Sequence, residues 1–277
     1  MTTLTTDLDV PVRRDPLDGV RAHISVRDTV SQTMTMAWRA TKKMRRNPEQ
    51  FFDVLIQPIL FTVMFAYIFG GAISGDVKSY LPLMIPGILA QTVLTACIAT
   101  GTQLREDMDK GVFDRFKALP IARVAPLAGP MVADLLRYLI ATVLTFAMGF
   151  VMGYRPGGGV PGVLAAGLLV VLCGWSMAWI FTFVGTIGRS AQSVQGISMM
   201  VMFPLTFVSN AYVPVRTMPD WLQAFVNINP VSHVVAATRS LANDGAFTSE
   251  VGWALLACAA VVAIFAPLSV KVFTRKM

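Results

Sequence analysis

The chain has 277 residues, of which 55% are hydrophobic and only 14% are charged, and its mean hydropathy is +0.61. Soluble domains carry about 25% charged residues, so this composition excludes an ordinary soluble protein and indicates a membrane protein with several spans. The net charge of +7 would suit a nucleic-acid partner in a soluble protein. Here we expect no nucleic-acid partner, because basic loops are typical of membrane topology.

The first segment, residues 1–26, is polar and contains no apolar core of the kind that a cleaved signal peptide requires. We expect a disordered cytoplasmic tail here. The remainder, residues 27–277, is expected to form one transmembrane domain.

Residues 28–46 have the periodicity of an amphipathic helix. At 100° per residue, the basic side chains fall opposite a largely apolar face. That face comprises Val30, Met34, Ala37, Trp38, Thr41 and Met44. Such a helix lies in the membrane interface with its basic side toward water and anionic lipid headgroups. The alternative is a solvated helix packed on its own protein. The residues expected to define the interfacial helix are Trp38, Arg39, Lys42, Lys43 and Arg46.

The apolar segments that follow are long enough to cross a bilayer, since about 20 apolar residues suffice. They predict an all-α membrane protein with six spans, at about 51–71, 82–103, 126–153, 160–186, 192–213 and 249–270. Lys and Arg are concentrated in the segments on the side of the N-terminus. Because cytoplasmic loops carry the excess of basic residues, both termini are predicted to face the cytoplasm.

A dense charged block, "REDMDKGVFDRFKALPIAR" at 105–123, forms most of the cytoplasmic loop predicted at 104–124. As a helix it carries an apolar stripe that includes Phe113 and Phe116, and Gly111 favours either a break in it or a close backbone contact. Aromatic anchors among charges of both signs suit a docking element, because the aromatic rings supply contact area and the charges set register. A solvated loop that only enforces topology is the alternative, and the pattern leaves both open.

Two charged residues, Asp134 and Arg137, lie near the predicted cytoplasmic end of the third span. They are three residues apart, a spacing that allows an ion pair on one helix face. We favour side chains that reach the membrane interface. The functional alternative is a cytoplasmic gate.

The segment 216–245 contains a run of spanning length, "WLQAFVNINPVSHVVAATR". Its central Asn and His side chains would be poorly satisfied in lipid. We therefore expect two short re-entrant helices in the outer leaflet, the first starting at Pro219-Asp220 and the two separated at Asn229-Pro230. For His233 we favour a structural role over a gate.

Four stretches resemble the ABC-2 type transporter permeases, and more narrowly their daunorubicin/doxorubicin-resistance type of drug exporter. They are "GVFDRFKALPIAR" in the charged block, "RNPEQFFDVLIQPILFTVMFAYIFGGAI" at 46–73, "YLPLMIPGILAQT" at 80–92 and "FVSNAYVPVRTMPDWLQAFVNINPVSHVVAATRSL" at 207–241. The resemblance implies a permease in a bacterial inner membrane that exports hydrophobic or amphiphilic drugs. Such permeases work with a separate cytoplasmic ATPase, two copies of each forming the exporter, as a permease homodimer or heterodimer.

In that family the loop between the second and third spans receives motion from the ATPase. The positions that the resemblance marks as ATPase contacts are Glu106, Asp107, Gly111, Asp114, Arg115, Phe116 and Lys117. ATP and Mg²⁺ would be bound by the ATPase, because this sequence contains no G-x-x-x-x-G-K-[ST] phosphate loop. No nucleophile–base constellation indicates a catalytic site. The three cysteines lack metal-ligand spacing, so neither a metal nor a cofactor is expected in this chain.

Two other functions are alternatives to drug export. The first keeps the fold but exports a cell-envelope lipid or glycan precursor. The second is a carrier without an ATPase, or a membrane anchor. Secondary carriers often show inverted repeats and ionisable residues at the middle of the membrane, and the sequence indicates neither.

Overall fold

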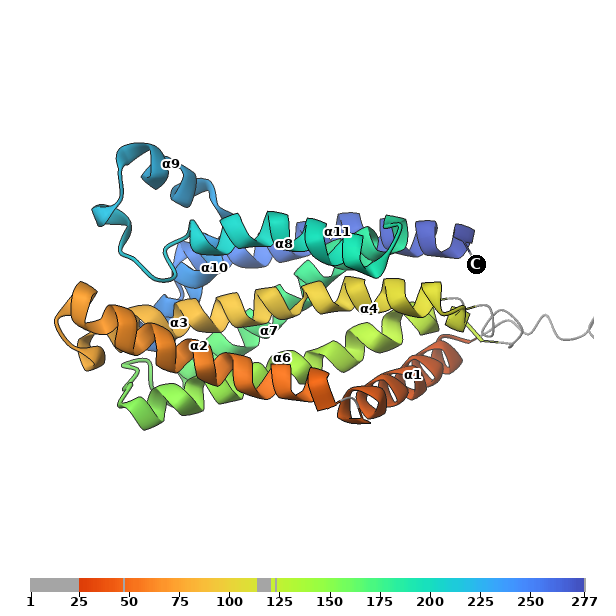
Figure 1. Ribbon diagram of the computed structural model, residues 1–277, viewed down its shortest axis with the longest axis horizontal. Coiled ribbons are helices and arrows are strands. Elements are labelled where there is room, and N and C mark those ends of the chain that lie inside the picture. Colours follow the sequence, from red (N-terminus) through yellow and green to blue (C-terminus); the bar gives the residue numbers. More distant parts are fainter. Residues whose placement is uncertain (1–24, 47, 114–120, 123, 277) are drawn as a thin grey trace, which may run out of the picture.

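The computed structural model describes residues 25–46, 48–113, 121–122 and 124–276. Nearly all of the predicted N-terminal tail, and Asp114, Arg115, Phe116 and Lys117 of the charged block, lie outside these ranges. The described chain is all helical and forms an elongated bundle (Figure 1). The long helices are α1 (Val26–Arg46), α2 (Pro48–Ser74), α3 (Val77–Ala96), α4 (Ile98–Asp109), α6 (Ala125–Met152), α7 (Gly159–Ile187), α8 (Ala191–Phe207) and α11 (Ser249–Lys276). The short ones are η1 (Val215–Thr217), α9 (Asp220–Ile228), α10 (Pro230–Arg239) and η2 (Ser240–Asp244).

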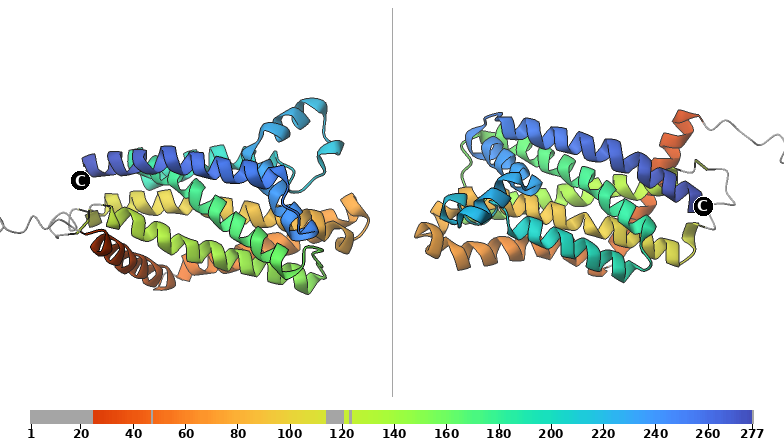
Figure 2. Two further views of the ribbon diagram at one scale, coloured as in Figure 1. Left: turned by 180° about the vertical axis from the view of Figure 1, so that it is seen from behind. Right: turned by 90° about the horizontal axis from the view of Figure 1, so that it is seen from above.

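The two ends of the bundle carry different elements. Figures 1 and 2 show α1 and the C-terminal end of α11 at one end, which we call the α1 end. The α2–α3 turn, the α6–α7 turn and α9 lie at the opposite end, which we call the α9 end. The described helices nearest the two ends of the sequence, α1 and α11, therefore reach the same end of the bundle.

Five stretches of described helix are long and apolar enough to cross a membrane. They are Leu55–Ser74, Val77–Asp109, Ala125–Met152, Gly159–Ile187 and Ser249–Arg275. The predicted fifth span, 192–213, is represented by α8, which has 17 residues and ends at Phe207. At 1.5 Å per residue α8 is about 25 Å long, shorter than a hydrocarbon core of about 30 Å.

The helix α3 lies at the centre of the bundle, in contact with α2, α6, α7 and α10. Its side chains Tyr80, Leu81, Met84 and Ile85 are fully buried. The uninterrupted apolar run around α3 therefore faces protein on most sides, which explains why it can continue for so long without a charge. Backbones also meet closely here, because a Cβ at Gly87 would lie 2.2 Å from the carbonyl oxygen of Ala211.

The break between α9 and α10 is at Asn229, as the Asn229-Pro230 pair predicts. The Asn229 amide nitrogen donates to the carbonyls of Leu205, at 2.7 Å, and Val208, at 2.6 Å. Its amide oxygen accepts from the N–H of Val231 at 2.9 Å. One buried side chain thus caps the end of α8 and the start of α10, which satisfies the amide that a lipid-facing helix would leave unpaired.

Candidate functional site

The helix α1 packs across the start of α6. Ala37 is buried, and a Cβ at Gly129 would lie 2.3 Å from the Cβ of Met36, so only glycine permits this approach. The side-chain oxygen of Gln32 also accepts a hydrogen bond from the N–H of Ala122 at 2.8 Å. These contacts hold α1 against the bundle at its α1 end.

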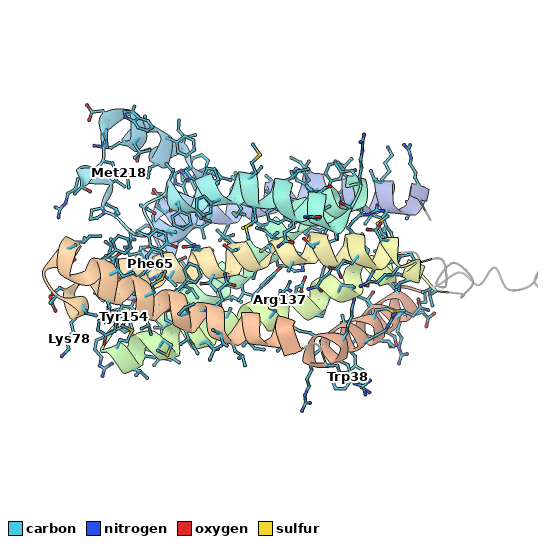
Figure 3. The ribbon with its side chains drawn as sticks, in the orientation of Figure 1. Trp38, Phe65, Lys78, Arg137, Tyr154 and Met218 are labelled. Carbon is cyan, nitrogen blue, oxygen red and sulfur yellow. The ribbon has the colours of Figure 1, made fainter. Side chains whose placement is uncertain are left out.

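The apolar face predicted for α1 is divided in the structure. Ala37 packs on the protein, whereas Val30, Met34 and Trp38 are 58%, 59% and 72% exposed. Figure 3 shows Trp38 directed away from the bundle. The helix therefore has one face on the protein, one open apolar face, and exposed basic side chains such as Lys42. The position of the open apolar face in the membrane interface stays a prediction.

The helices α1 and α4 are joined by an ion pair. The Lys43 ammonium lies 2.7 Å from the Asp107 carboxylate, and both side chains are partly exposed. An exposed pair of this kind contributes about 0–1 kcal/mol, so it sets orientation more than stability. A groove between α1, α4 and α6 surrounds the pair. Its lining residues are Met36, Arg39, Ala40, Lys43, Met44, Gln103, Leu104, Asp107, Val112, Phe113, Pro126 and Pro130.

Most charged side chains at the end of α4 form ion pairs with one another, four residues apart along the chain. Arg105 pairs with Asp109, and Lys110 lies 3.4 Å from Glu106. The chain then leaves the helix at Gly111, whose φ of +63° is in the left-handed region that favours glycine. The predicted break at Gly111 is confirmed.

Beyond that break the chain is anchored by an aromatic contact. Phe113 is buried, and its ring meets the ring of Phe273 on α11 edge to face at 4.9 Å. An aromatic pair of this kind fixes the chain just after the end of α4 against the C-terminal helix.

The two charged residues of α6 form a buried ion pair. The Arg137 guanidinium lies 2.6 Å from the Asp134 carboxylate, and the two residues are 5% and 8% exposed. The hydroxyl of Thr100 on α4 donates to the second carboxylate oxygen of Asp134 at 2.5 Å, and the Tyr138 hydroxyl lies 3.2 Å from Thr100. Figure 3 shows Arg137 among the helices rather than at an end of the molecule.

The favoured expectation that these side chains reach the membrane interface is therefore wrong, and the expected pairing is confirmed. The start of α6 at Ala125 is within one residue of the predicted start, so Asp134 is in the third turn of the helix, about 13 Å from its beginning, as expected. The physical reason is the face of α6 on which the two residues lie, because Asp134 faces α4 and both side chains are buried in the bundle.

A polar cluster joins the outer segment to α3 at the α9 end. Arg239 donates to the carbonyls of Leu83, at 2.9 Å, and Asn210, at 2.8 Å. Asn243 donates to the carbonyl of Pro82 at 2.8 Å, an oxygen that α3 leaves free because Pro86 has no N–H. Burial lowers the pKa of Arg239 to about 10, so this guanidinium remains charged at neutral pH.

A further titratable contact at this end joins α10 to α11. The His233 Nδ1 atom lies 2.6 Å from the Glu250 carboxylate, and both side chains are about one third exposed. His233 is thus held in a defined position, as a structural role requires. Within the ranges that the structure describes, no three His, Cys, Asp or Glu side chains lie close enough to hold a metal ion.

A sequence model of the ABC-2 type transporter family matches residues 31–242. The chain belongs to this family. It is also 41% identical over 247 residues to the daunorubicin resistance ABC transporter permease protein DrrB1 of Streptomyces coeruleorubidus, covering 89% of this chain and 87% of the relative. The doxorubicin resistance permease DrrB of Mycobacterium tuberculosis is 29% identical, covering 72% of both chains. The probable doxorubicin resistance permease DrrC of that organism is 26% identical, over 98% of this chain and 97% of the relative.

This ABC-2 permease is the multi-pass membrane component of an ABC transporter and not its catalytic subunit. The structure gathers the described members of the predicted coupling set, Glu106, Asp107 and Gly111, at the α1 end beside Lys43. It places Asp134 and Arg137 deeper in the bundle. The contact of Thr100 with this pair is not predictable from the sequence, because Thr100 belongs to a different span and no spacing along the chain relates it to Asp134 or Arg137.

Proposed function

We propose that this chain is the membrane-spanning half of an ATP-driven exporter of hydrophobic or amphiphilic drugs, powered by a separate cytoplasmic ATPase. The observation that carries the proposal is the 41% identity to a daunorubicin resistance permease across 89% of the chain. Two permease copies, as a homodimer or with a related partner, would pair with two ATPase copies.

The proposed topology has six spans, with α8 as the short fifth span. In this arrangement α9 and α10 enter the outer leaflet without crossing it, and residues 27–277 form one domain with both termini in the cytoplasm. Its support is the gathering of α1 and the C-terminal end of α11 at one end of the bundle. The 17-residue α8 would require local thinning of the bilayer or a flanking extension.

The ATPase would dock at the α1 end of the bundle. The support is a groove that combines an apolar floor, including Phe113, with the paired charges of Lys43 and Asp107. This is the mixture of contact area and charge that a docking surface uses. The exposed apolar face of α1, centred on Trp38, would lie in the inner membrane interface and keep the docking groove at the membrane surface.

The proposed cargo is uncharged or has delocalised charge. In the described spans the buried polar side chains away from the Asp134–Arg137 pair are neutral, mostly Thr and Ser with Gln91. Such a lining has few charged groups to bind a compact ion, and it suits ligands that are held mainly by contact with apolar surface. Asp134 and Arg137 would act as a gate on the cytoplasmic side of the cargo path.

The test is drug transport by the reconstituted pair. Vesicles that contain this permease and its ATPase would be loaded with daunorubicin, and ATP-dependent movement would be measured by fluorescence. The control is an ATPase whose phosphate-loop Lys is replaced. Drug movement that occurs with the active ATPase but not with the inactive one supports the proposal. Movement that survives with the dead ATPase indicates an ATPase-independent carrier, and an altered envelope lipid profile without drug movement indicates a lipid or glycan cargo.

A further inference from the structure

The helix of the second span is interrupted at a position that the sequence does not predict. The stretch Val77–Asp109 is long enough to be a single helix, but α3 ends at Ala96 and α4 begins at Ile98, with Cys97 between them. The N–H of Thr100 bonds to the carbonyl of Cys97 at 3.1 Å, which is the tight i to i+3 pattern. A short 3₁₀ turn inside a long helix is a common form of hinge.

The thiol of Cys97 occupies the gap in the helical ladder. Its sulfur lies 3.1 Å from the carbonyl oxygen of Val93 and 3.0 Å from that of Gly174 on α7. A side chain inserted beside the backbone ladder is a recognised cause of a helix kink. We call residues 96–101, which contain this interruption, the α3–α4 joint.

On the α7 side the joint is held by backbone contact. A Cβ at Gly101 would lie 2.1 Å from the carbonyl oxygen of Phe181, and a Cβ at Gly185 would lie 2.4 Å from that of Gly101. The two helices approach this closely because neither has a side chain at the contact. At Gly101 and Gly185 the two helices therefore have no interlocking side chains to oppose a small rotation.

On the α6 side the joint is held by the hydroxyl of Thr100. Thr100 is 5% exposed and donates to Asp134, which is paired with Arg137. A buried ion pair often stabilises a fold less than apolar side chains of the same volume would. The Asp134–Arg137 pair therefore suits a role in favouring one packing of the helices over another. Ionisable side chains inside a membrane bundle indicate function by default.

Beyond the joint, α4 leads directly to the region where the ATPase is proposed to act. Its last turn carries Asp107, paired with Lys43, and the helix ends just before the turn at Gly111. A displacement of the following loop would reach the bundle through these 12 residues of helix. The first polar contact of α4 with α6 along that route is the one from Thr100 to Asp134.

We propose that the α3–α4 joint is the point at which movement of the cytoplasmic loop enters the membrane bundle, and that Thr100 is the positioning residue that transmits it. In the packing described here Thr100 holds one oxygen of Asp134. When α4 turns at the joint this hydrogen bond breaks, and the Asp134–Arg137 pair takes a second arrangement. The inference rests on the proposed function, because it assumes that an ATPase moves the loop.

The test compares three substitutions on α4 in the reconstituted exporter. Thr100→Val removes the hydroxyl at nearly constant volume, and Thr100→Ser retains it. Thr102→Val is the matched control, because the Thr102 hydroxyl bonds to the carbonyl of Ile98 in its own helix. The readouts are ATP hydrolysis, ATP-dependent daunorubicin movement and the thermal midpoint.

For Thr100→Val we expect ATP hydrolysis to persist while the drug moved per ATP falls about tenfold, the loss that one hydrogen bond to a charged group predicts. Thr100→Ser and Thr102→Val should stay within about twofold of wild type on the same scale. If Thr100→Val does not accumulate in the membrane, Asp134→Asn should show the same loss of drug per ATP.

An unchanged ratio of drug to ATP in Thr100→Val, or in Asp134→Asn where that variant replaces it, would overturn the inference. So would parallel losses of hydrolysis, transport and thermal midpoint, since these indicate a purely structural contact. Failure of the wild-type pair to move any drug is a different result. It would refute the proposed function itself, and the inference would fall with it.

Discussion

Replacing Asn229 by Ala should destabilise the outer segment strongly. Asn229 is 3% exposed and supplies two donors to the end of α8 and one acceptor to the start of α10. Loss of the helix cap costs about 1 kcal/mol. Each buried carbonyl that loses its donor costs about 1–3 kcal/mol, reduced where water replaces the amide, so we expect a total of about 2–4 kcal/mol.

The assay is thermal unfolding of the purified permease in detergent. At about 2–4 °C per kcal/mol for chains of similar size, Asn229→Ala should lower the midpoint by roughly 5–15 °C. Asn229→Asp keeps the acceptor but places a carboxylate against two carbonyls, so it should be at least as harmful as Asn229→Ala. The control is Asn227→Ala, whose side chain is exposed. A midpoint for Asn229→Ala within about 2 °C of wild type would refute the capping argument.

Three further outcomes are expected. Arg137→Ala leaves its buried carboxylate partner unpaired and should cost about 3–5 kcal/mol in the same unfolding assay; a loss below about 1 kcal/mol would mean that the pair is hydrated. Gly87→Ala sets a Cβ 2.2 Å from the carbonyl oxygen of Ala211 and should cost about 1–3 kcal/mol, whereas Gly71→Ala, with nothing within 4 Å, should be neutral; equal effects would contradict the close contact. Hydrogen bonding with Ser79 lowers the pKa of Asp76 below 3.8, so the stability from this cap is complete above about pH 4 and lost as the pH falls through the lowered pKa; Asp76→Asn should remove that dependence, and an unchanged acid profile would contradict it.

Much of the fold was accessible from local sequence chemistry. Apolar runs of spanning length indicated the long helices, and Asn229-Pro230 indicated the break between α9 and α10. Gly111 marked the end of α4, because few other residues adopt its positive φ. These features depend on the residues at the position itself or on their immediate neighbours.

The burial of the Asp134–Arg137 pair inside the bundle could not be predicted from local sequence. The sequence places Asp134 and Arg137 near the cytoplasmic end of a span that starts at about 126, but it does not show which face of that helix meets another span. Their contact with Thr100 depends on the register of α4 against α6, which no periodicity along the chain encodes. The end of α8 is likewise capped by Asn229, a residue more than 20 positions later in the sequence, whose amide donates to the carbonyls of Leu205 and Val208.

The central claim is that this ABC-2 permease works with a separate ATPase that docks at its α1 end. The most direct measurement is capture of the tagged chain from native membranes in mild detergent, followed by identification of the proteins that co-purify. We would compare wild type with Asp107→Lys, which reverses the charge facing Lys43, and with Asp220→Lys, an exposed control at the α9 end. We predict that an ABC ATPase accompanies wild type and Asp220→Lys in equal amounts and is depleted with Asp107→Lys. The absence of any ABC ATPase from wild-type preparations, under conditions that keep known complexes intact, would contradict the account.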